Sequence, residues 1–540
     1  MKKFCCMNKP RIRILATLLA IVLVLPCVAA GENSKAFEPY ADPITLSMIY
    51  EVDVGVTFPE GDSIDNNVVT RKYTEMLNIN YDLSWQVDAG SYTTQLNAAI
   101  GSNTKLPDMF MLNKQQMYQL GSTGQLMDML PYYEEYGSEG LKKVLGFNDN
   151  EGIESGMIDG ALYGLPLTND VGDGASLVFI RQDWLDKLNL KVPHTVSELI
   201  EVAEAFVANN MSGRSSTMGI SMAHDLGFTM DVLANAYGAY PDLWLEDENG
   251  QLVYGSVQPQ MRDALLTMQD LYKRGLIHKE FAAQDITRLG GYVAQGRLGI
   301  LIGPFWYNNL YISSNFKANP DAEWTVINNL ALNEGDTVAS RAWNTTYRWL
   351  AVSKDCEHPE AVVKTMNLWY EMWQGSLAEW FWGLQMSDEY YSIDMKYYSP
   401  IFFDPPLKNC GVGLHLREAI ETGDTSKLNP EEINAYTKLT NPATPAGYKA
   451  SYLTWFGSFK LLNETYNTFV YDKFRGPTDT IFSAIQSTVD ELEIGTFVRI
   501  IMGEDISLFD DFVEQWYDEG GDYLTTMVNA WYMMNKKAGK

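Results

Sequence analysis

The order of hydrophobic and polar residues along the chain predicts short strands that alternate with amphipathic helices. A first strand is expected at residues 44–50, and Val69 and Tyr73 begin an apolar stripe with helical spacing after it. Further strands are expected at residues 81–87, 106–112, 177–180, 298–303 and 348–353. Strands that alternate with helices indicate parallel βαβ units, so the pattern predicts an α/β fold.

The sequence also predicts where several helices begin and end. Thr195 and Glu198 form a capping box in front of an apolar helical face. A second apolar stripe runs from Met261 and stops before Gly275, and Pro359 suits the first turn of another helix. The C-terminal part of the chain is predicted to be helical and rich in aromatic residues.

The first 30 residues are predicted to be a secretory signal. Five basic residues precede an apolar stretch at residues 14–26, and small residues lead up to a cleavage site after Ala30. An alternative is a lipid anchor on Cys27, although Pro26 stands where a lipoprotein signal needs a small residue, so release is preferred. Only Cys356 and Cys410 remain after the signal, either as one disulfide or as two buried thiols.

Length and charge narrow the class of protein. A chain of 540 residues is too long for one core, since single cores stop growing near roughly 250–300 residues. The net charge of −29 argues against a nucleic-acid or anionic-membrane partner, both of which need a basic surface. Without its signal the chain has 35 basic and 69 acidic residues, a net charge of −34. Such a charge suits a soluble protein outside the cell, because it keeps the molecules from associating.

The usual signatures of catalysis are missing from the sequence. The five histidines form no zinc-binding pair at helical spacing, and there is no nucleophile elbow, phosphate-binding loop or dinucleotide fingerprint. We therefore predict no catalytic residue, no metal site and no cofactor. A pair of carboxylates that hydrolyses sugars has no fixed sequence spacing, so a carbohydrate-active enzyme stays as an alternative.

Aromatic residues that stand beside polar ones are the most informative feature. They gather at residues 303–309, 343–348, 380–382 and 455–457, near predicted strand ends. A sugar offers an apolar face and a rim of hydroxyls, so it needs a flat aromatic platform and polar partners, because an unpaired buried hydroxyl costs about 1–3 kcal/mol. Ligands of α/β sheets bind beyond the carboxyl ends of strands, where these groups are expected.

At this point the sequence resembles a known family, the family-one extracellular solute-binding proteins of bacterial ABC importers. It is most similar to the large lipoprotein-type sugar binders of Gram-positive bacteria. The motifs that carry the resemblance are residues 106–108 (LPD), 163–166 (YGLP), 179–193 (FIRQDWLDKLNLKVP), 295–299 (QGRLG), 303–308 (GPFWYN), 359–363 (PEAVV), 497–503, 520–522 and 528–532.

The resemblance implies a two-lobed periplasmic-binding-protein-like fold of type II, with hinge-crossing strands and a central ligand cleft. By analogy the first lobe takes residues 44–175 and 348–375, the second takes residues 176–347 and 376–540, and residues 31–43 form a linker. The implied function is capture of a carbohydrate, in particular an oligosaccharide, for delivery to the permease of an ABC transporter, by a monomer without catalysis. Alternatives are a secreted carbohydrate-active enzyme and a sugar-sensing partner of a membrane receptor.

The same resemblance suggests which side chains face the ligand. The candidates from the resemblance are Glu51, Asp53, Asn113, Asn169, Asp170, Asp173, Phe305, Trp306, Tyr307, Trp343, Asn344 and Arg348, and the aromatic clusters add Trp382 and Trp455. Arg181 and Asp183 match motif positions but are interpreted as structural, because they stand at a helix start. Many relatives carry a calcium loop after the capped helix, whereas residues 209–217 here contain no carboxylate, so no calcium is predicted there.

Overall fold

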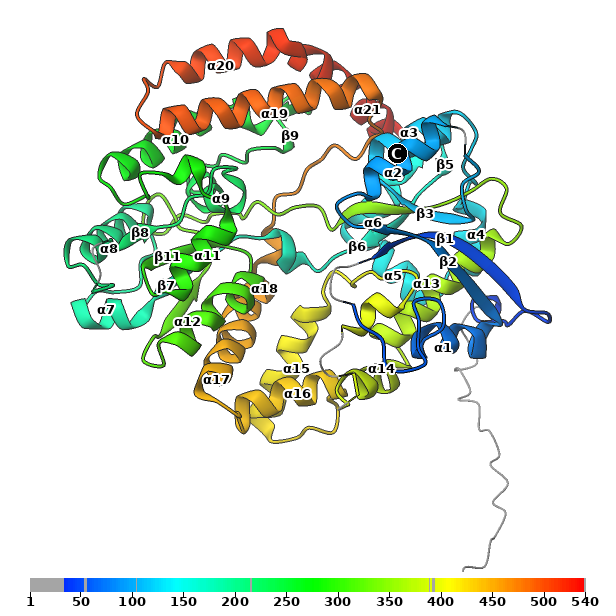
Figure 1. The fold of residues 1–540 in the computed structure, drawn as a ribbon. Helices are drawn as coiled ribbons and strands as arrows, with labels where there is room; N and C mark the ends of the chain where they lie inside the picture. The colour runs from blue at the N-terminus through cyan, green and yellow to red at the C-terminus, as the bar shows by residue number, and fades with distance from the viewer. Residues whose placement is uncertain are drawn as a thin grey trace, which may run out of the picture.

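A computed structural model describes residues 34–538 except 53–55, 103, 214–215, 388 and 391–393. The predicted signal, including Cys27 and Ala30, therefore lies outside the described residues. Two mixed sheets form the frame of the molecule, and helices cover both (Figure 1). None of the helices in the described ranges is long and apolar enough to cross a bilayer.

The first sheet has five strands in the order β2-β1-β3-β13-β6. Strands β1, β2 and β3 are parallel, as the alternation of strands and helices predicts, and β13 runs antiparallel between β3 and β6. The strands are β1 (Ile44–Val52), β2 (Ile79–Asp88), β3 (Met109–Leu112), β6 (Leu165–Thr168) and β13 (Thr346–Val352). A small hairpin stands apart, formed by β4 (Met157–Ile158) and β5 (Ala161–Leu162).

Helices bury both faces of this sheet. Leu350 points into one hydrophobic cluster and its neighbour Trp349 into another, because successive side chains of a strand face opposite ways. The elements around the sheet are η1 (Ser34–Ala36), α1 (Val68–Leu77), α2 (Tyr92–Gly101), α3 (Lys114–Ser122), α4 (Leu130–Tyr136), α5 (Glu139–Leu145), α6 (Phe147–Ser155), α13 (Pro359–Trp373), α14 (Ala378–Gln385) and η6 (Met395–Tyr398). Pro359 occupies the first turn of α13, as predicted.

The second sheet has four strands in the order β12-β7-β11-β8. It too is buried on both faces, since Val178 and Ile180 contribute to one cluster while Leu177 and Phe179 contribute to another. The strands are β7 (Leu177–Arg181), β8 (Met218–Ile220), β11 (Leu298–Gly303) and β12 (Trp324–Ile327), with a separate hairpin of β9 (Trp244–Glu246) and β10 (Leu252–Tyr254).

The helices of the second half pack on this sheet in two groups. The predicted capping box of Thr195 and Glu198 opens α8. The inner helices and turns are α7 (Gln182–Leu188), α8 (Val196–Ala208), α9 (Gly227–Ala236), η3 (Gly255–Val257), α10 (Pro259–Lys273), η4 (Phe281–Ala283), α11 (Ile286–Ala294), η5 (Asn308–Ile312) and α12 (Ser313–Ala318). The later ones are α15 (Lys408–Thr422), α16 (Pro430–Thr440), α17 (Pro445–Tyr452), η7 (Leu453–Ser458), α18 (Phe459–Thr465), η8 (Tyr466–Thr468), α19 (Thr480–Ile501), α20 (Leu508–Trp516), η9 (Tyr517–Gly521) and α21 (Asp522–Ala538).

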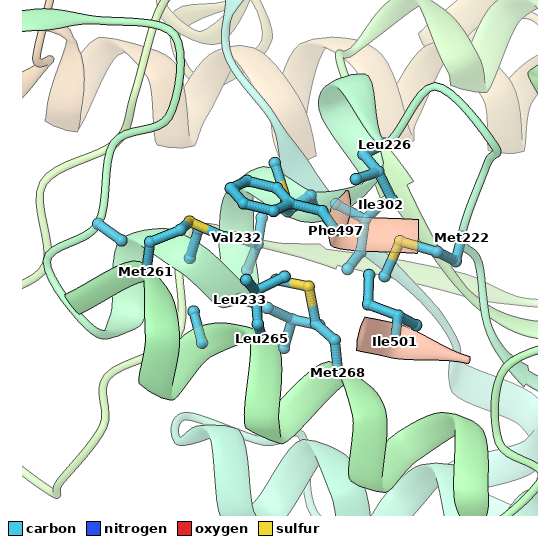
Figure 2. Close-up of a cluster of buried hydrophobic side chains, with 14 of the residues drawn as sticks. Met222, Leu226, Val232, Leu233, Met261, Leu265, Met268, Ile302, Phe497 and Ile501 are labelled. Atoms are coloured by element: carbon cyan, nitrogen blue, oxygen red, sulfur yellow. The ribbon is translucent and has the colours of Figure 1, made fainter. Parts of the chain in front are cut away.

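The C-terminal helices complete the core of the second sheet. Phe497 and Ile501 of α19 meet Met261, Leu265 and Met268 of α10 in one cluster (Figure 2). This packing explains the helical, aromatic C-terminal pattern of the sequence, because each helix buries one apolar face.

The described residues between 378 and 403 pack with the first sheet. Phe381, Met395 and Phe403 share a hydrophobic cluster with strands β1, β2 and β13. The expected division of the chain assigned this segment to the second lobe, whereas its buried contacts are with the core of the first. The exact lobe boundaries stay a prediction.

Residues 169–176 and 328–345 run from one sheet to the other, and residues 469–479, which lead from η8 to α19, pair with the second of them. They are tied to one another by backbone hydrogen bonds: the Trp343 amide donates to the Gly174 carbonyl at 3.1 Å, and the Ala342 amide donates to the Val470 carbonyl at 3.0 Å. Two isolated bridges, Ala175 with Ala342 and Arg341 with Val470, continue this contact. The three segments therefore lie side by side where the two sheets are joined.

Candidate functional site

A pocket of about 210 Å³ opens beside this connection, at the edge of the first sheet. The carboxyl ends of β1, β3 and β6 meet there, together with the start of the antiparallel β13. Its lining residues are Tyr50, Glu51, Met111, Leu167, Thr168, Asn169, Tyr347, Arg348, Tyr397, Ser399, Pro400, Ile401 and Phe402. The pocket thus occupies the place where ligands of α/β sheets bind.

An ion pair lies in the wall of the pocket. Nη1 of Arg348 donates to Oε2 of Glu51, and the same nitrogen lies 3.9 Å from Sδ of Met111. The pair joins β1 and β13, which are separated in the sheet by β3. Glu51, Asn169 and Arg348 are three of the residues that the sequence suggested, and the structure brings them to one pocket.

Exposed aromatic rings border the same pocket. The Tyr347 side chain is 57% exposed, and Phe402 is 36% exposed with its ring centroid 5.5 Å from that of Tyr397 in an edge-to-face contact. The Tyr50 hydroxyl donates to the Tyr397 carbonyl and holds this loop against β1. These residues offer both apolar faces and hydroxyl or carbonyl groups, the combination that a sugar requires.

A second group of aromatic residues follows the strands of the other sheet. Trp343 is 47% exposed and stacks on Phe228, with centroids 4.4 Å apart and ring planes 26° apart. Half-buried Trp306, which follows β11, meets Phe228 edge to face at 6.2 Å. The Trp343 stack is therefore an aromatic surface open to solvent at the connection between the sheets.

Carboxylates surround the first crossing segment. Asp170 is buried and accepts hydrogen bonds from the amides of Gly172 and Asn409, both at 2.9 Å. Burial raises the pKa of Asp170 to about 8, and the neighbouring Asp173 adds to this effect. Burial raises the pKa of Asp173 to about 7, and Asp404 adds to it, whereas Lys396 opposes it.

Arg341 anchors the second crossing segment. Its Nη1 donates to Asp231 at 3.0 Å and its Nη2 to Asp242 at 3.1 Å, while the Ser176 hydroxyl donates to the other oxygen of Asp231 at 3.0 Å. Arg341 and Asp231 are both buried, so this ion pair lies inside the connection between the sheets and is not open to a ligand. No group of three or more His, Cys, Asp or Glu side chains in the described part of the chain converges to hold a metal ion.

Three of the aromatic candidates are core residues. Phe305 packs on Phe459 at 4.6 Å, and Tyr307 is buried in the same cluster. Trp382 is buried in the first core, where its Nε1 donates to the Trp373 carbonyl at 2.9 Å. None of these three presents an open face, because burial in a core satisfies the large apolar area of such rings.

The remaining candidates have other surroundings. Trp455 is half-buried and stacks on Phe459 at 5.3 Å, away from the pocket. The Asn113 side chain caps α3 by accepting from the Gln116 amide at 2.9 Å. Asn344 is half-buried next to Trp343. Asp53 lies outside the described residues.

The sequence reasoning missed Phe228, Tyr347, Tyr397 and Phe402. Tyr347 lies inside the segment 343–348 that the aromatic pattern singled out, so its exposure was the missing information. Phe228 follows β8 and reads as an ordinary apolar residue of a helix start. Tyr397 in η6 and Phe402 just after it belong to a segment rich in aromatic residues and proline, and this composition is the signal that could have found them.

Comparison with known proteins finds relatives among bacterial binding proteins and lipoproteins. The polygalacturonan/rhamnogalacturonan-binding protein YtcQ of Bacillus subtilis is 26% identical over 305 residues, which cover 55% of this chain and 57% of YtcQ. Lipoprotein LipO of the same organism is 24% identical over 471 residues, which cover 84% of this chain and 86% of LipO. The chain thus spans less than two thirds of YtcQ but most of LipO.

A solved structure of the alginate-binding protein AlgQ2, without calcium ion, has the same fold. The two superpose with a TM-score of 0.59 at 17% identity, over 92% of this chain and 99% of AlgQ2. Residues 58–371, more than half of the chain, match the family described as bacterial extracellular solute-binding protein. With two α/β lobes, crossing segments and a pocket at the strand ends, the chain belongs to the bacterial extracellular solute-binding proteins, a family of binding proteins.

Proposed function

We propose that this protein captures an oligosaccharide between its two lobes and delivers it to the permease of an ABC transporter. One observation carries the proposal: open aromatic rings and polar groups stand together at the strand ends, on both sides of the crossing segments. On the first lobe these are Tyr347 and Phe402 beside Asn169, and on the second they are Trp343 and Phe228. YtcQ and AlgQ2, whose names describe polysaccharide-binding proteins, support a carbohydrate ligand.

A screen by thermal unfolding tests this function directly. Ligand at 100 times its dissociation constant adds about 2.7 kcal/mol to the free energy of unfolding, because it binds the folded state alone. We expect mono- and oligosaccharides to separate into a few that raise the melting temperature and many that do not. If no saccharide raises it, the carbohydrate function is refuted.

The enzyme alternative needs a separate measurement. A glycoside hydrolase requires two carboxylates on either side of one sugar subsite. The oligosaccharides that stabilise the protein should be recovered intact after long incubation with it, as chromatography would detect. Release of shorter sugars, lost when Asp173 is replaced by Asn, would favour the enzyme instead.

The location and state of the protein form part of the same proposal. We expect export through the N-terminal signal, with release after Ala30 or a lipid anchor at Cys27, and action as a monomer. Mass spectrometry of the exported protein distinguishes the two possible N-termini: a chain that begins at Gly31 supports release, and a lipid on Cys27 supports anchoring. A receptor-bound sensor would share the fold, and it would be recognised if sugar uptake survived deletion of this protein.

A further inference from the structure

The charges around the pocket bear on the kind of sugar that it accepts. Arg348 is the one cation among the lining residues of the described pocket, and its guanidinium is already bound to Glu51. The two side chains are 34% and 19% exposed, so the pair lies at the pocket surface and its net charge is zero. A ligand carboxylate would have to compete with Glu51 for the same guanidinium.

The next cation is Lys396, which also has acidic neighbours. Its Nζ lies 3.2 Å from Asp394 and close to the rings of Tyr397 and Phe402, at 5.0 Å and 5.7 Å from their centroids. Burial lowers the pKa of Lys396, but the charges of Asp394 and Asp404 raise it by more, so the ammonium stays charged beside carboxylates. Its charge is therefore offset before any ligand arrives.

Beyond these two cations the surroundings are acidic. Asp173 and Asp404 add to the effect of burial in raising the pKa of Asp170, and Asp404 does the same for Asp173, so these three carboxyl groups lie close together. Arg341 is buried with Asp231 and also pairs with the exposed Asp242, and it cannot turn toward a ligand without leaving the buried Asp231 carboxylate without its cation. The raised pKa values of Asp170 and Asp173 show that negative charge is disfavoured in this place, so a ligand carboxylate would meet the same penalty.

We propose that this pocket selects uncharged oligosaccharides over those built from uronic acids, and that Glu51 sets this preference by occupying Arg348. The inference rests on the carbohydrate function proposed above and names the class of its ligand. This preference would distinguish the chain from YtcQ and AlgQ2, whose names refer to acidic polysaccharides.

Matched pairs of sugars test the preference. In each pair the linkage is the same and only C6 differs, as a hydroxymethyl group or a carboxylate: 1,4-linked galacturonate and galactose oligomers, mannuronate and mannose oligomers, and glucuronate and glucose oligomers. Binding is measured by titration calorimetry at pH 7. We expect the neutral member of any pair that binds to have a Kd at least about tenfold lower than its uronate, with little dependence on salt.

Glu51→Gln is the decisive variant. It removes the carboxylate that holds Arg348, so the uronate of the binding pair should gain about tenfold in affinity and the preference should shrink or invert. Glu154→Gln is the matched control, because it removes a carboxylate from another Arg pair, with Arg475 at 2.8 Å, outside the lining of this pocket. The control should keep the wild-type preference.

The outcomes separate the two proposals. If the uronate of a pair binds the wild type as tightly as the neutral sugar or more tightly, the selectivity is refuted while the carbohydrate function stands. If Glu51→Gln folds with an unchanged melting temperature but the preference persists, the role of Glu51 is refuted. The wild-type comparison decides the charge preference even if the variant fails to fold, and binding of no sugar refutes the function itself.

Discussion

Replacement of Trp343 by Ala should weaken ligand binding far more than it weakens the fold. Trp343 is 47% exposed and stacks on Phe228. A tryptophan buries about 150–250 Å² in a core, so about 80–100 Å² of this ring remains for a ligand to cover. At about 25 cal/mol per Å² this area is worth about 2 kcal/mol, which corresponds to a roughly 30-fold rise in Kd when the ring is lost.

Loss of the Trp343 ring should lower the melting temperature of the ligand-free protein only slightly, because the chain is long. The buried half of the ring contributes about 2 kcal/mol to the free energy of unfolding, an upper estimate because the unfolded chain already hides some apolar area. With an unfolding entropy of about 2.1 cal/mol/K per residue, a chain of this length should melt only about 2 °C lower. Calorimetric titration with a stabilising sugar and a melting curve of the free variant measure the two effects.

Trp382→Ala is the matched comparison, because the same residue type is removed from a core. Trp382 is 6% exposed and packs 4.6 Å from Trp373, so its removal should lower the free energy of unfolding by about 3–5 kcal/mol. The folded fraction of that variant should keep the wild-type Kd. The reasoning fails if Trp343→Ala leaves Kd unchanged, or if Trp382→Ala weakens binding as much as Trp343→Ala does.

Three further predictions concern the crossing segments and the cysteines. Because the pKa of Asp173 is raised to about 7, the unfolded chain releases this proton near pH 4 while the folded chain keeps it, so the free energy of unfolding should fall between pH 4 and 7. Asp173→Asn should flatten this fall, as urea titrations at several pH values would measure. The same pH slope in the variant and the wild type would contradict the assignment. A methyl group on Gly174 would lie 2.9 Å from the backbone nitrogen of Trp343, so Gly174→Ala should lower the free energy of unfolding in urea by about 1–3 kcal/mol and weaken sugar binding. Wild-type values for both quantities would show that the segment shifts to accept the methyl group without cost. Cys356 and Cys410 are buried free thiols in separate cores, and burial raises the pKa of both thiols to about 12. A thiol reagent should therefore label both only after the protein unfolds. Rapid labelling of the native protein would refute their burial.

Local signals in the sequence were enough to predict many of the elements. Thr195 with Glu198 and Pro359 act on their own helix ends, so the sequence alone places the starts of α8 and α13. The position of β13 between β3 and β6 depends on pairing between distant segments, and an alternating pattern carries no information about the partner. The parallel units were therefore predictable, and the antiparallel strands within each sheet were not.

The pocket shows the same limit at the level of side chains. Glu51 and Arg348 were both candidates, but their ion pair arises from strands that nearly 300 residues separate. Residues such as Trp306 and Trp382 have similar aromatic neighbours in the sequence, yet one is half-buried near the crossing segments and the other lies in a core. Only the packing of distant elements decides which aromatic ring stays open.

The arrangement of the aromatic rings also bears on how a ligand could draw the lobes together. A ligand favours a closed state only through contacts that it makes there and lacks in the open state. Contacts with Tyr347 and Phe402 come from one lobe and would be equally available in both states, so they add affinity without favouring closure. Phe228 belongs to the other lobe, and Trp343 lies on a crossing segment whose backbone is bonded to Gly174. A sugar that reached from the pocket to this stack would be held by both lobes at once, which is why an oligosaccharide suits this site better than a single sugar ring.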